Sequence, residues 1–156
     1  MTPDQAARDH LAALTPLWLP NQRPAELKTH SVQQLRNGAQ IVRLEQQVGQ
    51  VPIHQGEIRV LVNRNGSLAA VSGTVLPNAG RATFQSPASA AVESALDALY
   101  GAARVRPAVS EAAPVDGYSA VTVAATPEIQ VQTARARREM MLDGDRLVPI
   151  HAVELF

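Results

Sequence analysis

The same helix-start pattern occurs twice in this chain, and each time alternating apolar and polar residues follow it. The first copy, Thr2-Pro3-Asp4-Gln5, offers an N-cap, a proline at the first helical position and a capping-box glutamine. The second copy starts at Ser86-Pro87, again a cap residue before a proline. Helices followed by strands with one buried face predict helices packed on antiparallel sheets.

The first half of the chain predicts one helix and a meander of strands. Apolar residues recur at helical spacing at Ala7, Leu11 and Leu14. We expect Pro16 and Pro20 to end this helix, with Trp18 folded back onto the core. The alternating segments predict strands over 26–35, 39–48, 57–62 and 68–75. Asn65-Gly66 predicts a tight hairpin turn, because both residues tolerate positive φ.

The second half repeats this order with different residues. Its helix carries an apolar stripe at Val92, Leu96 and Leu99 and is expected to end at Gly101. Residues 102–117 read as a connection rich in proline and alanine. Three strands are predicted over 118–125, 129–142 and 147–155, with the turn between the last two at 143–145.

These halves predict an α+β fold of two tandem cystatin-like modules, each a helix packed on an antiparallel sheet. The linker at 77–86 is rich in proline, glycine, asparagine and serine, so the modules are placed at residues 1–78 and 84–156.

The composition argues against several classes of partner. Lys plus Arg and Asp plus Glu both number 14, so no global field favours nucleic acid or an anionic membrane. Only five aromatic residues are available for stacking on bases, and no apolar run approaches the roughly 20 residues of a membrane helix. We therefore expect no nucleic-acid partner, no membrane insertion and a monomer.

No catalytic or metal-binding pattern is present. The chain has no cysteine, so thiolate metal sites, cysteine nucleophiles and disulfides are excluded. The histidines fall at no metal-ligand spacing; they are His10, His30, His54 and His151. The sequence predicts a protein that is not an enzyme and that needs no cofactor.

One basic cluster allows two interpretations. On a strand, Arg135 and Arg137 would share a face and Arg138 would lie on the opposite face. The cluster is either a solvated strand face or a contact surface for an acidic partner.

One segment resembles a known family. Residues 42–53 read VRLEQQVGQVPI, which is similar to the core of the FTP domain, the fungalysin/thermolysin propeptide module. An alternating strand, a polar turn with glycine and a strand ending in Val71-Ser72-Gly73 follow in the order of that family. The family places a glycine directly before the Val-Pro pair, whereas this chain has Gln50 there and Gly49 one place earlier. The resemblance assigns structural roles to Gln46, Pro52, Gly66 and Gly73.

The end of the chain, residues 145–155, resembles the last strand of a PepSY-like module, which follows the FTP domain in fungalysin-type propeptides. The resemblance implies a non-catalytic propeptide that inhibits a secreted zinc metallopeptidase, assists its folding and is cleaved away. The cognate peptidase would be the partner in cis. Inhibition would be steric, with Arg137, Arg138 and His151 as candidate contacts near the junction.

The implied precursor is secreted or periplasmic, although this chain shows no basic or hydrophobic region of a signal peptide. Two other functions remain open. The first is a free-standing binding or inhibitor module that is never fused to a peptidase. The second is an enzyme with a pocket between helix and sheet, which the apolar inward positions Ile58, Val60, Leu96 and Leu99 argue against.

Overall fold

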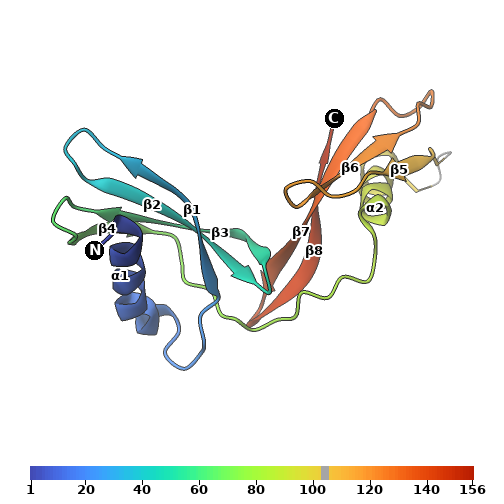
Figure 1. Cartoon of the computed structure of the whole chain (residues 1–156). Coiled ribbons are helices and arrows are strands. Elements are labelled where there is room, and N and C mark those ends of the chain that lie inside the picture. Colours follow the sequence, from blue (N-terminus) through green and yellow to red (C-terminus); the bar gives the residue numbers. More distant parts are fainter. Residues whose placement is uncertain (103–105) are drawn as a thin grey trace. The chain divides into compact units, whose positions relative to one another are not determined.

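The computed structural model describes residues 1–102 and 106–156. Its elements are α1 (Pro3–Trp18), β1 (Glu26–Gln34), β2 (Gln40–Val48), β3 (Val51–Val62), β4 (Leu68–Ser72), α2 (Ala88–Tyr100), β5 (Val109–Glu111), β6 (Tyr118–Val123), β7 (Thr133–Asp143) and β8 (Arg146–Leu155) (Figure 1). They form two compact units. The first unit contains Met1–Ala82 and Met140–Val148, and the second contains Thr83–Glu139 and Pro149–Phe156.

The α+β class predicted from the sequence is confirmed. The strands form one mixed eight-stranded sheet in the order β1-β2-β3-β7-β6-β5, with β4 also paired to β3 and β8 to β7. The ladders β1–β2, β2–β3, β3–β4, β5–β6 and β6–β7 are antiparallel. A single parallel bridge, Ile53 with Met140, joins β3 to β7. Both predicted helices are found, and strands lie close to the predicted ones. Strand β5 was missed, because its three residues lie in the segment that was interpreted as a connection.

Helix α1 begins as its sequence predicts and ends later. Thr2 is the N-cap, and its hydroxyl accepts a hydrogen bond from the Gln5 N–H at 3.2 Å. The expectation that Pro16 ends the helix was wrong, because Pro16 lies inside α1. The last turn instead closes with the Leu19 N–H bonded to the Thr15 carbonyl at 2.9 Å. Trp18 packs against the core of the first unit, as predicted.

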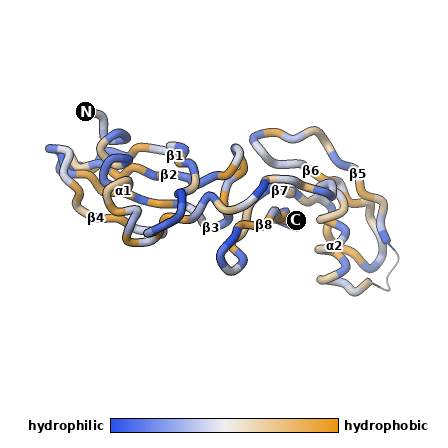
Figure 2. Tube along the Cα trace, turned by 90° about the horizontal axis from the view of Figure 1, so that it is seen from below, coloured by the Kyte–Doolittle hydropathy of each residue, from blue (hydrophilic) through white to orange (hydrophobic). Residues whose placement is uncertain are grey.

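The core of the first unit lies between α1 and one face of β1–β4. Alternation along the strands points every second side chain of β2 and β3 toward α1, and Figure 2 shows this alternation of hydropathy along the chain. The buried members of this core are Ala6, Ala7, Leu11, Val42, Leu44, Ile58, Val60, Val62 and Val75. Polar contacts add to it: Arg8 bonds the Thr29 hydroxyl at 2.8 Å and the Asp4 carboxylate at 2.9 Å, which ties α1 to β1.

A second core of the first unit draws on distant parts of the sequence. Met140 and Leu147, from the β7–β8 hairpin, are buried together with Ala25, Val48 and Ile53. The Leu147 N–H also donates to the Ala79 carbonyl at 3.1 Å. The sequence placed residues 140–148 in the second module, whereas their contacts group them with the first unit.

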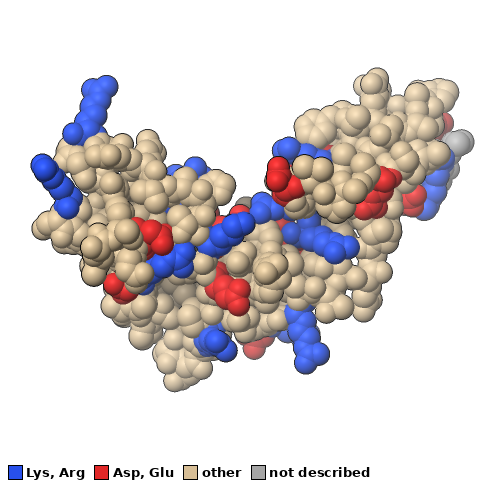
Figure 3. Space-filling model, in the orientation of Figure 1, with Lys and Arg blue, Asp and Glu red and all other residues tan. Residues whose placement is uncertain are grey.

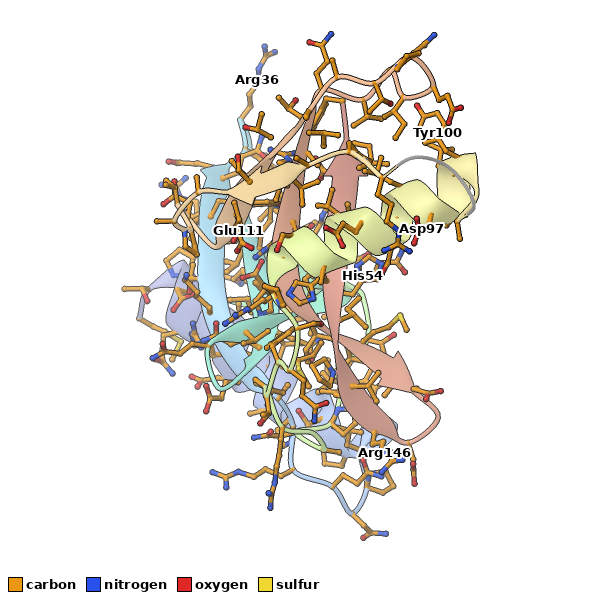
Figure 4. All side chains as sticks on the ribbon, turned by 90° about the vertical axis from the view of Figure 1, so that its right-hand side faces the viewer. Arg36, His54, Asp97, Tyr100, Glu111 and Arg146 are labelled. Carbon is orange, nitrogen blue, oxygen red and sulfur yellow. The ribbon has the colours of Figure 1, made fainter. Side chains whose placement is uncertain are left out.

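The second unit packs α2 on β5–β8, with a buried core of Val92, Leu96, Val121, Val123, Ile129, Val131 and Ala134. Leu99, predicted to face inward, is 62% exposed, so the apolar stripe ends at Leu96. The predicted Ser86 cap was also wrong, because the N-cap is Pro87 and has no side-chain hydrogen bond. Glu111 of β5 caps the helix instead, accepting from the Ser89 N–H at 3.0 Å, and Figure 4 shows it beside the first turn of α2.

One turn of the first unit differs from its predicted geometry, and another tolerates the sequence departure at Gln50. In the β3–β4 turn only Gly66 has positive φ, at 84°, while the Asn65 side chain accepts from the Ser67 N–H at 3.0 Å. In the β2–β3 turn Gly49 and Gln50 have φ of 53° and 67°. Positive φ at both central residues matches the right-handed twist of the flanking strands, so the turn forms despite the departure at Gln50.

Candidate functional site

Gln46 occupies a gap in the β2–β3 ladder. Register alternation directs its side chain to the buried face of β2, where it is 0% exposed. The ladder pairs Glu45 with Glu57 and Gln47 with Pro52, so Gln46 alone faces the stretch Ile53–Gly56 of β3. This irregularity leaves backbone groups without ladder partners.

The Gln46 amide bonds three backbone groups around this gap. Its Nε2 donates to the Gly56 carbonyl at 3.0 Å and to the Thr74 carbonyl at 2.8 Å. Its Oε1 accepts from the Leu76 N–H at 2.7 Å. One side chain thus joins β2, β3 and the segment after β4, which gives a physical basis to the structural role assigned by the family resemblance.

The other family-motif residues flank this centre. Pro52 is the second residue of β3 and is separated from the Gly49-Gln50 turn only by Val51, near a strand start where its missing N–H is tolerated. Gly73 follows β4 with φ of 111°, and a Cβ there would lie 2.7 Å from the Glu57 carbonyl oxygen. Gly66 also has positive φ, but a Cβ there would meet no atom within 4 Å.

Substitutions at Gly73 and Gly66 therefore distinguish the cost of steric crowding from the cost of positive φ alone. We expect Gly73→Ala to destabilise the first unit by about 2–3 kcal/mol, because strained backbone and crowding act together. Gly66→Ala, with open space around it, is expected to cost about 1 kcal/mol from its backbone conformation alone. Urea unfolding followed by Trp18 fluorescence measures both, and equal costs would contradict this assignment.

Two of the three candidate contact residues lie together in the second unit. The rings of Phe84 and His151 meet edge to face, with centroids 5.3 Å apart and planes at 68°. The Arg138 guanidinium carbon lies 5.1 Å from the centroid of the same Phe84 ring. Beside them a hollow of about 340 Å³ is lined by Thr83, Phe84, Gln85, Ser86, Pro149 and His151.

The electrostatics of this cluster favour neutral His151. Burial lowers the pKa of His151 below its ordinary value, the Arg138 charge lowers it further, and Glu111 acts in the opposite direction. No motif in the sequence marks Phe84 as a contact residue. The available signal was that it is the only aromatic residue of the polar linker and the helix start that follows it.

Arg137 lies apart from this cluster, on the opposite face of β7, as the alternation predicts. Its guanidinium carbon is 5.5 Å from the Tyr118 ring centroid, and that of Arg135 is 4.8 Å from the same centroid. Arg137 also pairs with Glu139 at 3.8 Å, and Arg135 pairs with Glu154. The three candidate contacts therefore form two surfaces and not one.

Several opposite charges form ion pairs elsewhere in the described residues. On the first unit, Glu57 bonds Arg43 at 2.7 Å and Arg59 at 2.6 Å. These bonds, that from Arg43 first, hold the pKa of Glu57 below its ordinary value. Figure 3 shows that some acidic and basic side chains lie close to one another on the visible face, while other basic side chains project alone.

No group of three or more histidine, aspartate or glutamate residues that could hold a metal ion occurs within residues 1–102 and 106–156.

A polar hollow of about 540 Å³ in the first unit is lined by turn residues that include Arg36 and Arg64, but Arg36 points away into solvent (Figure 4). In the part of the chain that the structure describes, neither helix has the length and apolar character needed to cross a membrane.

The residues that match a known family coincide with strands β1–β4. No curated protein matches the chain. Residues 25–75, about a third of the chain, match the family described as Fungalysin/Thermolysin Propeptide Motif. The matched range starts just before β1, includes all of β1–β4 and contains Gln46, Pro52, Gly66 and Gly73. The first unit thus carries an FTP propeptide motif, of a kind found in the propeptides of fungalysin- and thermolysin-type peptidases.

Proposed function

We propose that this chain acts as a non-catalytic propeptide, which inhibits a secreted zinc metallopeptidase and assists its folding. The observation that carries the proposal is the FTP motif at residues 25–75, which coincides with the whole β1–β4 layer and its Gln46 centre. Its partner would be the peptidase domain of the same precursor, in the secretory or periplasmic compartment.

A rigid folded surface can inhibit such a peptidase by covering its cleft. Zinc peptidases cleave extended chains bound beside the metal, so a partner that excludes such chains blocks the reaction. The chain has no cysteine that could ligate the zinc. A tether to the peptidase would raise the effective concentration to about the millimolar range, so that modest intrinsic affinity suffices. Cleavage of the tether and loss of the propeptide would release activity.

We further propose that the second unit is a PepSY-like module, that the two modules are cystatin-like, and that the second supplies contacts to the peptidase. Arg138 and His151 share one face of the β7–β8 hairpin with Phe84, whereas Arg137 lies on the other face. A flat surface of the peptidase can cover only one of these faces. Substituting Arg138 and Arg137 separately therefore tests which face contacts the peptidase.

The purified chain is expected to inhibit its cognate mature peptidase in a saturable manner. Arg138→Ala is expected to weaken inhibition by about tenfold, which corresponds to about 1.4 kcal/mol. Arg137→Ala tests the opposite face, and Arg36→Ala, an exposed turn arginine of the first unit, is the control.

Full peptidase activity at micromolar excess of the chain, with no complex in gel filtration, would contradict inhibition in trans. If neither Arg137→Ala nor Arg138→Ala changes inhibition, the contact assignment fails and the inhibitory function stands. The folding role is tested separately, by the yield of active peptidase after refolding with and without the chain.

A further inference from the structure

Phe84 anchors an otherwise polar segment of the second unit to strand β8. The segment Thr83–Ser86 precedes α2 and has neither helical nor strand structure. Thr83, Gln85 and Ser86 are exposed, whereas Phe84 is partly buried against His151 of β8. The position of this segment on the sheet therefore depends mainly on the contact of one aromatic ring.

The contact is suited to a neutral imidazole. The Nε2 atom of His151 is buried and has no hydrogen-bond partner among the described residues. An imidazolium carries N–H groups on both nitrogens, so protonated His151 would leave a buried donor without an acceptor. Such a group costs about 1–3 kcal/mol, and more when it is charged.

The charges around His151 oppose protonation as a whole. Arg138 on β7 stacks on the Phe84 ring, and its positive charge disfavours protonation of His151. Glu111 on β5 favours the imidazolium, but its carboxylate also accepts the Ser89 N–H. The segment 83–86, the first turn of α2 and the β8 neighbours of His151 contribute no charged side chain.

We propose that Phe84 and His151 form a pH-sensitive latch, which is closed while His151 is neutral and opens when His151 gains a proton. Opening moves Phe84 off the imidazole and lets water solvate the charge. If the proposed function holds, acidification would thereby weaken the Arg138–His151 contact with the peptidase.

The direction of the effect follows from the two states. The pKa of His151 is lowered in the closed state and returns toward its ordinary value of about 6.5 in the open state. The open state therefore binds more protons, and the closed state is fully favoured above about pH 6.5. Below this pH the closed-to-open ratio falls by up to about tenfold per pH unit, until the closed-state pKa is reached.

Proton NMR of the whole chain, without any peptidase, tests the latch. The imidazole signal of His151 is expected to titrate below about pH 6.5 in the parent chain. In Phe84→Ala it should titrate nearer 6.5, because the ring that excludes water is gone. The Phe84 ring signals of the parent should shift along the His151 titration curve. In His151→Gln they should not change with pH.

His30→Gln is the control, because His30 is exposed on β1 of the first unit, and the pH response should persist in it. Phe84→Leu retains apolar volume and serves if Phe84→Ala fails to fold. The latch is refuted if His151 titrates identically in the parent and the Phe84 variant. It is also refuted if the Phe84 ring signals of the parent do not shift over the pH range in which His151 titrates. Because no peptidase is present, failure of the latch and failure of inhibition are distinguished.

Discussion

Gln46→Leu is expected to lower the free energy of unfolding of the first unit by about 4 kcal/mol. Leucine fills a similar volume but makes none of the hydrogen bonds from the Gln46 amide to the Gly56 carbonyl, the Thr74 carbonyl and the Leu76 N–H. Each group left buried without a partner costs about 1–3 kcal/mol. A loss of this size is a large part of the 5–15 kcal/mol typical of a whole domain.

The measurement is urea unfolding followed by the fluorescence of Trp18, the only tryptophan, which packs against the core of the first unit. The matched control is Gln47→Leu. Gln47 is the next residue of β2, partly exposed on the other face, and its substitution should change stability by less than about 1 kcal/mol. Equal effects of the two substitutions would show that Gln46 does not organise the gap between β2 and β3.

Met140→Ala is expected to destabilise the first unit by about 3–5 kcal/mol, although Met140 is far in sequence from the helix and strands that form most of that unit. Its side chain is 0% exposed and packs in one cluster with Ile53, Val48 and Leu147. Truncation removes this apolar contact and leaves a cavity, and the cost of the cavity adds to the lost burial.

The adjacent Met141 supplies the control, because it has the same chemistry and is 40% exposed. Met141→Ala should cost less than about 1 kcal/mol. Trp18 fluorescence reports the unfolding of the first unit in both variants. If Met140→Ala leaves this transition unchanged, the β7–β8 hairpin does not stabilise the first unit.

Features set by neighbouring residues were predicted correctly from the sequence. The Thr2 cap depends on a hydroxyl and an N–H three residues apart, so a short motif contains both partners. Strand alternation likewise placed Arg135 and Arg137 on one face of β7 and Arg138 on the other. The family resemblance gave Gln46 a structural role, and only the structure showed that its side chain is buried.

Local rules failed where packing outweighs propensity. Pro16 removes one N–H but lies in the last turn of α1, so the helix continues to Trp18, whose packing on the core helps to hold that turn. The α2 cap comes from Glu111, a residue distant in sequence that compensates for the absence of a local cap. Neither outcome is encoded within a few residues.

The sequence by itself determined the α+β class, the start of α1, most of the strands and the FTP motif, because each depends on periodicity or on spacing within a short segment. Only the tertiary structure placed Met140 and Leu147 in the core of the first unit and Phe84 on His151. It alone also showed which ring each arginine stacks on, Tyr118 for Arg137 and Phe84 for Arg138. These contacts join residues far apart in the chain, and their free energy comes from side-chain packing, which no single segment specifies.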